Sequence, residues 1–389
     1  MLKKVAIVLY LFLLKIKQVF PKKKGQKHIL IIKTDAIGDY IIFRNFLMEI
    51  ANHYKGYKIT FLGNILLKDL AAELDQSIIH NFIYVNHKTL NADWFKLLKE
   101  IAIKNYELTI NFHYSRTFIG DVFSYASNAK KKIAMDGDDL NMNQHLREMF
   151  NQMYDVLIKT PPSIINEFAR LKFFTEQIIN DEITFTQPYL KLSDKKFAEI
   201  IPTEEFIVFA PGAAVKNRQL EISKLGDIVR FVLKTNTICF IGSPDECAMV
   251  EEIKANIPHH QLSKIIDLTG KTPLTALPFI LNEALAIICN DSGIFHIAAA
   301  LKKTTLCLTG GGHFERFLGY PVQKNVRFCY KSMPCFNCEW KCIYKFPLSD
   351  PYPCINAIEL QSVYQNFSFL ENEYIKYGKE STNNKNTIS

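Results

Sequence analysis

The sequence predicts an α/β protein with two Rossmann-like units, each organised around a parallel sheet. Its 389 residues suit two domains rather than one. Apolar runs alternate with helical patterns in both halves of the chain, which is typical of parallel sheets covered on both faces. Two of these runs, ending at residues 32 and 289, lead through a glycine-containing turn directly into a helical pattern. Turns of this kind place a helix N-terminus at the carboxyl edge of a sheet, where an anion can bind.

In the first half, the apolar runs are short and their spacing is regular. The expected strands cover residues 28–32, 58–62, 81–85 and 107–112, and the expected helices cover 40–50, 66–74 and 94–103. Residues 136–189 are more polar and read as helices, with a loop at 160–162, that form the crossover into a second unit.

The second half repeats the alternation. The expected strands are residues 206–210, 238–241, 265–268, 285–289 and 304–308, and a helix is expected over about 222–233. We expect an N-terminal domain over 25–190, a C-terminal domain over 191–360, and a C-terminal helix and disordered polar tail over 361–389. Two such domains predict a cleft between them, lined by loops from the carboxyl ends of both sheets.

Residues 1–24 contain seven lysines and no acidic residue, so much of the net charge of +8 lies there. An apolar run of ten residues, 5–14, is bracketed by these lysines; this is short of the ~20 residues that span a bilayer. No small-residue cleavage site follows. We expect a helix on the inner leaflet of the membrane, with a signal anchor and a helix packed on its own domain as alternatives. The protein would then be cytoplasmic and peripherally associated with the inner membrane, and nucleic acid is not an expected partner.

The turn at residues 290–293, Asn-Asp-Ser-Gly, is the strongest candidate for ligand contact. Asp291 or Ser292 would cap the following helix, and Gly293 allows a ligand to approach the backbone closely. An ordinary βαβ connection is the alternative interpretation. No GxGxxG follows a strand and no GxxxxGK[ST] is present, which argues against a dinucleotide oxidoreductase and a P-loop nucleotidase. The glycine run at 310–312 is a weaker candidate for phosphate contact.

Four segments together resemble the ADP-heptose:lipopolysaccharide heptosyltransferases of glycosyltransferase family 9. They are ILIIKTDAIGD at 29–39, FAPGAAVKNRQLEISKLGDIV at 209–229, FIGSPDE at 240–246 and NDSGIFHIAAAL at 290–301, in the family's order. The resemblance implies a GT-B fold, two Rossmann-like domains facing a central cleft. It also implies inverting transfer of a heptose from a nucleotide-sugar donor to a lipopolysaccharide core or other lipid-linked glycan acceptor. The donor that the resemblance favours is ADP-heptose. No cofactor is then required for catalysis. Two alternatives stay open. The donor could be a UDP- or GDP-sugar, or the chain could be a non-catalytic protein of the same fold that binds sugar nucleotides or acts as a membrane scaffold.

The resemblance assigns roles to residues at the ends of the strands. Asp39, in the Gly38-Asp39 pair, is the expected general base, because a cleft carboxylate can accept a hydroxyl proton in the transition state. Asp35 is the second candidate for the base, and helix N-capping is the ordinary use of either residue. Donor contacts are expected from nine further residues and from Gly38: Gly212, Ala213, Lys216, Arg218, Glu246, Asp291, Ser292, Gly293 and His296.

Some donor positions depart from the family. Arg218 stands where relatives commonly have Lys beside the pyrophosphate, with Lys216 as the alternative, and Leu220 stands where a Trp often follows. Arg binds phosphate well, so the role is retained. Glu246 matches the acid that contacts ribose; a helix-start acid is its alternative interpretation. His296 is as readily a packed core residue as a ligand.

Five of the nine cysteines lie in residues 329–354, here called the Cys-rich segment. The pattern CxxC, CxxxC and a later Cys suits a structural zinc site, with these ligands: Cys335, Cys338, Cys342 and Cys354. An iron–sulfur cluster needs the same ligands, and reduced core thiols and disulfides also stay open. Cys239, Cys289 and Cys307 lie in apolar runs and are expected to be small core residues in a reducing compartment.

Overall fold

The computed structural model describes residues 27–86, 92–192, 196–320 and 325–385. The expected membrane-associating segment therefore lies outside the described residues. Two compact units divide the chain, Met1–Thr184 and Phe185–Ser389. The division falls a few residues before the expected boundary at 190, because the backbone N–H of Leu190 donates to the carbonyl of Ala300 in the second unit.

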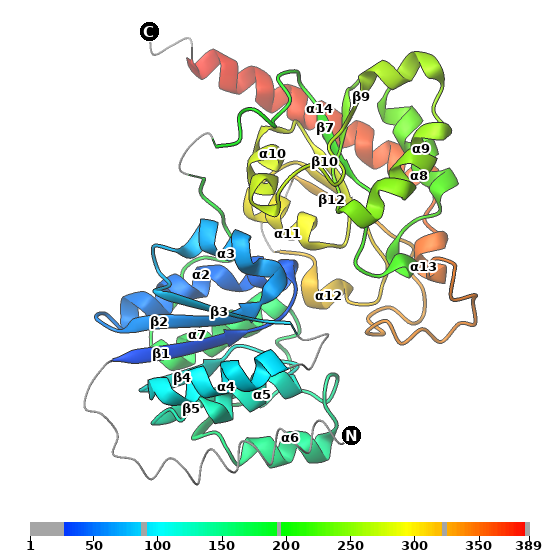
Figure 1. Cartoon of the computed structure of the whole chain (residues 1–389). Helices are drawn as coiled ribbons and strands as arrows, with labels where there is room; N and C mark the ends of the chain where they lie inside the picture. The colour runs from blue at the N-terminus through cyan, green and yellow to red at the C-terminus, as the bar shows by residue number, and fades with distance from the viewer. Residues whose placement is uncertain (1–26, 87–91, 193–195, 321–324, 386–389) are drawn as a thin grey trace. The chain divides into compact units, whose positions relative to one another are not determined.

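The first unit contains a six-stranded parallel sheet with the order β3-β2-β1-β4-β5-β6 (Figure 1). The chain winds outward from β1 in one direction and returns to the other side of β1 with β4, so the switch point lies between these strands. The strands are β1 (His28–Lys33), β2 (Lys58–Asn64), β3 (Asn81–Val85), β4 (Leu108–Asn111), β5 (Lys131–Met135) and β6 (Val156–Ile158).

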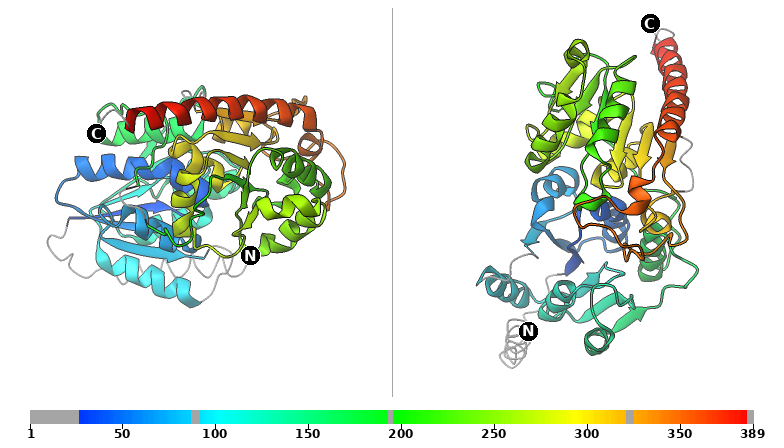
Figure 2. Two further views of the ribbon diagram at one scale, coloured as in Figure 1. Left: turned by 90° about the horizontal axis from the view of Figure 1, so that it is seen from above. Right: turned by 90° about the vertical axis from the view of Figure 1, so that its right-hand side faces the viewer.

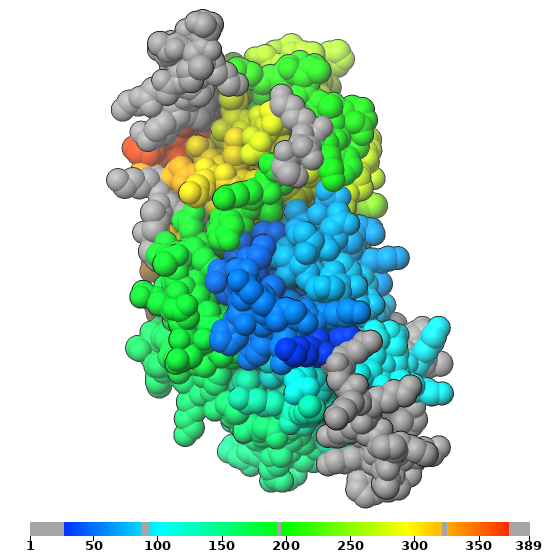
Figure 3. Space-filling model, turned by 90° about the vertical axis from the view of Figure 1, so that its left-hand side faces the viewer, coloured from blue at the N-terminus to red at the C-terminus, as the bar shows by residue number. Residues whose placement is uncertain are grey.

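Helices cover both faces of this sheet. On one face α4 (Ala92–Lys104) and α5 (Phe118–Ala126) pack Trp94 and Phe123 against Leu30 of β1. On the other, α2 (Ile37–His53) and α7 (Glu167–Ile179) each direct a phenylalanine onto Phe112, which follows β4. The remaining helices are η1 (Ile65–Leu67), α3 (Lys68–Asp75) and α6 (Gln144–Asn151). In the space-filling view, the blue and light-blue atoms of α2 and α3 form a continuous surface of this unit (Figure 3).

The second unit repeats the arrangement with the order β12-β11-β10-β7-β8-β9, and all its strands are parallel. Its switch point lies between β7 and β10. The strands are β7 (Ile207–Ala210), β8 (Ile238–Phe240), β9 (Ile265–Asp267), β10 (Ile287–Asn290), β11 (Thr305–Leu308) and β12 (Val326–Cys329).

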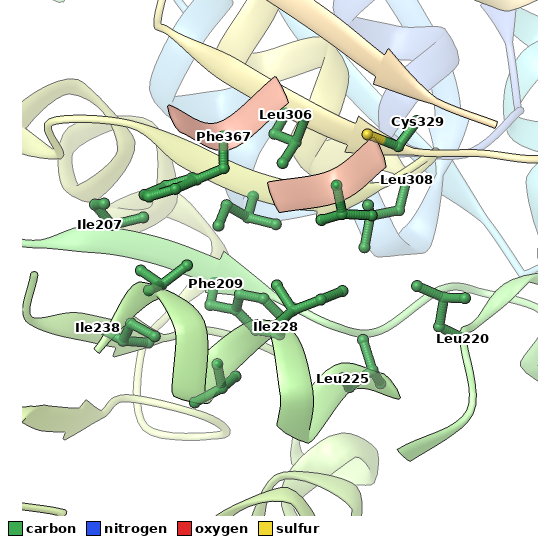
Figure 4. Packing of buried hydrophobic residues seen from close by; sticks show 14 of the residues in the cluster. Ile207, Phe209, Leu220, Leu225, Ile228, Ile238, Leu306, Leu308, Cys329 and Phe367 are labelled. Atoms are coloured by element: carbon green, nitrogen blue, oxygen red, sulfur yellow. The ribbon is translucent and has the colours of Figure 1, made fainter. Parts of the chain in front are cut away.

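One apolar core lies between this second sheet and the helices α8 (Ile222–Val232) and α14 (Leu360–Lys385). Side chains from both helices, including Ile228 and Phe367, meet Phe209 and Leu306 of the strands (Figure 4). Leu220 belongs to this core and is buried. Figure 2 shows α14 as one long helix along the second unit. The other helices are η2 (Lys216–Arg218), η3 (Pro244–Glu246), α9 (Cys247–Ala255), η4 (His259–Lys264), η5 (Leu274–Ala276), α10 (Leu277–Glu283), α11 (Gly293–Ala300), α12 (Phe314–Phe317) and α13 (Pro353–Asn356).

The two-unit α/β prediction is confirmed, and the differences concern the margins of the sheets. Strands β5, β6 and β12 were not expected from the sequence. The first begins with two lysines, the second has three residues, and the third includes Arg327, so none forms the continuous apolar run of a central strand. Within the helix and disordered tail expected over 361–389, α14 extends as far as Lys385, so the helix takes up most of this region. None of the helices in the described residues is long and apolar enough to cross a membrane.

Candidate functional site

In the second unit, neighbouring strands bring three of the expected donor-binding loops to one edge. Since β7 lies between β10 and β8, the turns that follow these three strands meet at the carboxyl edge of the sheet. The Asn290 side chain joins two of them: its Nδ2 donates to the carbonyls of Pro211 at 2.5 Å and Gly212 at 3.1 Å. The Ala213 carbonyl accepts from Gln219 Nε2 at 3.2 Å, which closes the loop after β7 on itself.

Arg218, in η2 of that loop, carries a guanidinium that forms no ion pair within the described part of the chain. Its guanidinium carbon lies 4.3 Å from the ring centroid of Trp340. Among the described residues no side chain forms an ion pair or hydrogen bond with the guanidinium, and its Nε is buried without a partner. Burial lowers the pKa of Arg218, and the Asp291 carboxylate partly offsets this. A half-buried guanidinium that forms no ion pair or hydrogen bond with another side chain of the described residues is suited to bind an anion. Lys216 is exposed beside it.

The turn after β10 presents the N-terminus of α11. Ser292 occupies the N-cap position, but its side chain makes no cap hydrogen bond, and its Oγ is buried without a partner. The expected side-chain capping is therefore absent at Ser292. Burial raises the pKa of Asp291 to about 6, while Arg218 acts in the opposite direction. The backbone N–H groups from Gly293 onward and a buried hydroxyl thus line the same edge as Arg218.

Glu246 has a structural task at this edge. It forms a capping box with Ser243, whose backbone N–H donates to Glu246 Oε2 at 2.6 Å. A Cβ atom at Gly212 would overlap the Glu246 carboxylate, and one at Gly242 would lie 2.5 Å from it. Both glycines are therefore required for this carboxylate to fit. The helix-start interpretation is confirmed by this geometry, and the ribose contact stays a prediction.

His296 is a packed residue of the core. It is 5% exposed, its Nδ1 lies 2.7 Å from the Tyr320 hydroxyl, and its ring contacts Phe295. Burial lowers its pKa to about 3, so the imidazole is neutral at physiological pH. The other predicted donor contacts of the second unit lie in the loops at the sheet edge, whereas His296 is buried within α11. Gly38 belongs to the first unit.

In the first unit, the candidate base lies beside a buried ammonium group. Lys33 ends β1, is 1% exposed, and its Nζ lies 2.8 Å from Asp35 Oδ2. Burial would lower the pKa of Lys33, but the carboxylates of Asp35, Glu167 and Asp39 outweigh it and raise the pKa. Asp39 lies in the first turn of α2, after buried Gly38; the N-cap is Ala36, so neither aspartate is the capping residue.

His113, which the sequence analysis missed, joins this cluster from the neighbouring strand end. Its Nε2 accepts the Thr34 backbone N–H at 2.9 Å and lies 3.5 Å from Asp35, and its Nδ1 lies 2.6 Å from Asn111 Oδ1. Burial lowers its pKa to about 4, against the influence of Asp35. The available signal was its position directly after a strand that flanks the switch point.

The Cys-rich segment packs on the glycine run after β11. A Cβ atom at Gly311 would overlap the Phe336 ring, and one at Gly312 would overlap the Trp340 ring. The backbone N–H groups of Asn337 and Glu339 donate to the carbonyls of Gly311 and Gly312, each at 2.7 Å. The glycines therefore admit aromatic rings, and the weak expectation of a phosphate contact there has no support in this packing.

None of the nine cysteines, all within described stretches, forms a disulfide. Cys239, Cys289 and Cys307 are buried in the core, as expected. Burial raises the pKa of Cys338, the Trp340 backbone N–H opposes this, and the neighbouring thiols of Cys335 and Cys342 raise it further. Burial likewise raises the pKa of Cys354, and Cys338 and Cys342 act in the same direction. Within the described residues, however, no group of three or more His, Cys, Asp or Glu side chains is arranged to hold a metal ion.

Two units, each built on a parallel six-stranded sheet, are the architecture of the GT-B glycosyltransferases. The sequence pattern described as glycosyltransferase family 9 (heptosyltransferase) matches residues 94–344. The chain belongs to this family, and the resemblance found in the four segments is confirmed.

Individual relatives are distant in sequence and similar in fold. Lipooligosaccharide heptosyltransferase 2 of Haemophilus ducreyi is 23% identical over 293 residues, which are 71% of this chain and 80% of that protein. The solved structure of E. coli ADP-heptose lps heptosyltransferase II superimposes with a TM-score of 0.70 at 16% identity, covering 90% of this chain and 99% of that chain. The solved structure of E. coli heptosyltransferase WaaC with ADP-2-deoxy-2-fluoro heptose superimposes with a TM-score of 0.62 at 16% identity, covering 89% of this chain and 99% of that chain.

Proposed function

We propose that this glycosyltransferase moves a heptose from ADP-heptose to a lipid-linked glycan acceptor such as a lipopolysaccharide core, with inversion at the anomeric carbon. The proposal depends most on one observation: the half-buried guanidinium of Arg218 forms no ion pair with any carboxylate of the described residues, and Asp291 acts on it only without direct contact. A diphosphate is the part of a nucleotide sugar that would supply the missing negative charge. The relatives named for ADP-heptose and lipooligosaccharide support the choice of donor and acceptor.

The donor diphosphate would lie along the edge formed by the turns after β7 and β10. Arg218 would form charge-assisted hydrogen bonds with it, and the N-terminus of α11 would face the same anion. As the bond between the anomeric carbon and the phosphate oxygen breaks, its electron pair passes to the departing ADP. The fixed positive charge of Arg218 stabilises the growing charge without reorganisation, so we propose that no catalytic metal is needed.

Asp39 would act as the general base. The acceptor hydroxyl oxygen forms the new bond to the anomeric carbon, and its proton passes to the Asp39 carboxylate. The Lys33 ammonium supports this assignment, because a neighbouring cation favours the ionised carboxylate that a base requires. Asp35 is less suitable, since it is committed to Lys33 at 2.8 Å.

Replacement of Asp39 by Asn tests the assignment. We expect transfer to fall roughly 100- to 10,000-fold, the usual contribution of a general base, while ADP binding measured by calorimetry is unchanged. Asp69→Asn is the matched control, because Asp69 is an exposed acid in the first turn of α3 in the same unit. Unchanged turnover of the Asp39 variant would remove this residue from the mechanism.

The donor-binding half of the proposal is tested separately with ADP, UDP and GDP. We expect selective binding of ADP, and a loss of roughly ten- to a hundredfold in affinity for Arg218→Met, because charge-assisted hydrogen bonds contribute about 1.5–3 kcal/mol. Lys302→Met is the control, since Lys302 is an exposed cation of the same unit that follows the C-terminal end of α11, away from the helix N-terminus at the donor edge. Preference for UDP or GDP would keep the enzyme class and change the donor.

Two further parts of the proposal concern location and metal. We propose that the enzyme works at the inner leaflet of the membrane, through the basic segment 1–24, because its acceptor is lipid-linked. We also propose a structural zinc held by the four thiols of the Cys-rich segment, on the basis of their spacing in the sequence and of their mutual electrostatic influence. The four thiols, all in described residues, are not gathered around one point in the structure, so zinc would have to draw them together when it binds. Cys338→Ser should then lower the zinc content of purified protein, whereas Cys247→Ser, at an exposed and separate position, should not. Equal zinc content in the two variants would contradict the metal assignment.

A further inference from the structure

The Cys-rich segment contacts the loop that carries Arg218, although the two are far apart in sequence. Nδ2 of Asn217, the residue before Arg218, donates to the carbonyls of Leu348 at 2.8 Å and Asp350 at 2.6 Å. The Asn217 carbonyl in turn accepts the Tyr352 backbone N–H at 2.8 Å. Three hydrogen bonds, two from the Asn217 side chain and one to its backbone carbonyl, therefore join η2 to the end of the Cys-rich segment.

The Arg218 side chain is held by the same segment. Its guanidinium carbon lies 4.3 Å from the Trp340 ring centroid, within the range of a cation–π contact. Trp340 is itself sandwiched: its ring lies 4.8 Å from that of Tyr352, and a Cβ atom at Gly312 would overlap it. The indole is thus a fixed surface, and the guanidinium rests on it.

The backbone at Trp340 indicates that this placement is imposed by its surroundings. Trp340 has φ of 62°, in the left-handed region that bulky residues rarely occupy, and Glu339 has φ of 53°. Such a conformation costs on the order of 1–3 kcal/mol and persists only where neighbouring contacts determine it. Here the contacts are the glycine run on one side and Arg218 on the other.

We propose that Trp340 is a positioning residue for Arg218: it holds the guanidinium by one face and leaves its N–H edge directed to the donor diphosphate. This inference rests on the proposed donor site. A stacked guanidinium keeps its planar set of donors available for phosphate, and it loses less side-chain freedom when the anion binds. In this chain Leu220 is buried in the core, and the aromatic ring that contacts Arg218 comes from the Cys-rich segment.

Affinity for ADP tests the proposal first. We expect Trp340→Leu to weaken ADP binding roughly five- to tenfold, within the range of a desolvated cation–π contact, and Trp340→Phe to restore most of the affinity because it retains a ring. Phe346→Leu is the matched control: Phe346 also contacts Tyr352, at 5.1 Å between ring centroids, and shows no contact with Arg218. Equal ADP affinity of Trp340→Leu and the unchanged protein would overturn the inference.

A double-mutant cycle separates positioning from general damage to the fold. In protein that already carries Arg218→Leu, the further change Trp340→Leu should leave ADP affinity unchanged, because its effect passes through the guanidinium. An equal loss in both backgrounds would mean a structural role only and would refute the proposal. If the unchanged protein binds neither ADP nor ADP-heptose, the proposed function itself fails, which is a different outcome.

Fluorescence gives a direct readout of the contact. The chain has two tryptophans, Trp94 and Trp340, and Trp94 lies in the core of the first unit. In Trp94→Phe protein, ADP titration should change the emission of Trp340 saturably, with the same affinity as in calorimetry. The change should disappear with Arg218→Leu, and an emission that is silent to bound ADP would contradict the proposed geometry.

Discussion

The buried imidazole of His296 predicts a defined loss of stability in acid. Its pKa is lowered from 6.5 to about 3 by burial, so the folded state excludes a proton that the unfolded state accepts below pH 6.5. The stability that depends on the neutral imidazole is fully present above pH 6.5 and falls as the pH drops toward 3. Each pH unit below 6.5 costs about 1.4 kcal/mol, which amounts to about 2 kcal/mol at pH 5.

The measurement compares His296→Asn with the unchanged protein by urea unfolding at pH 7, 6 and 5. Asn keeps a polar group near the Tyr320 hydroxyl and does not titrate in this range. Burial raises the pKa of Asp291 in the same unit to about 6, which acts in the opposite direction, but this contribution is common to both proteins and cancels in their difference. We expect the unchanged protein to lose about 2 kcal/mol more than the variant between pH 7 and pH 5.

The exposed His260 supplies the control, and His260→Asn should show no such pH-dependent difference. Trp340 fluorescence in Trp94→Phe protein follows the second unit separately from the first. A parallel pH dependence of the His296 variant and the unchanged protein would show that this imidazole titrates as it does in water. That result would refute the core placement and restore His296 as a ligand candidate.

Two other changes test the donor edge, and a third tests the packing of the Cys-rich segment. Asn290→Leu removes the hydrogen bonds to the carbonyls of Pro211 and Gly212. Denaturation should show a free energy of unfolding lower by about 1–3 kcal/mol, and calorimetry should show weaker binding of ADP. Glu246→Gln keeps an acceptor for the capping box, so unfolding should change by less than about 1 kcal/mol; a selective loss of ADP over inorganic pyrophosphate would assign the carboxylate to the ribose. Gly312→Ala should destabilise the second unit by about 1–3 kcal/mol, since its Cβ overlaps an aromatic ring, and an unchanged thermal midpoint would contradict this packing.

The central strands were predictable because burial on both faces leaves little choice of residue. Residues 29–32 are apolar and fully buried in the structure, and the run at 285–289 becomes the strand beside the switch point. The strands at the margins of the sheets do not form long apolar runs, because β5 begins with two lysines, β6 has only three residues and β12 includes Arg327. The crossover at 136–189 was predicted as helices with a loop, and β6 lies within it.

The donor edge was predictable in position and less so in detail. The strand–turn–helix pattern identified the turn that carries Asp291, and the family resemblance placed Arg218 at the same edge. The sequence left two alternatives open for both Glu246 and His296. The capping box of Glu246 is a local contact with Ser243, whereas the burial of His296 depends on Tyr320, which is distant in sequence. The Trp340 contact was hidden for the same reason.

The Cys-rich segment and the glycine run form a single packing unit, in which each stretch depends on the other. Gly311 and Gly312 leave the space that Phe336 and Trp340 fill, and their carbonyls accept the backbone of the segment. A relative with side chains at these glycine positions has no room for the segment, and a relative without the segment has no need of the glycines. Chimeras between family members should therefore exchange the two stretches together, since transplanting either alone creates a clash or a void.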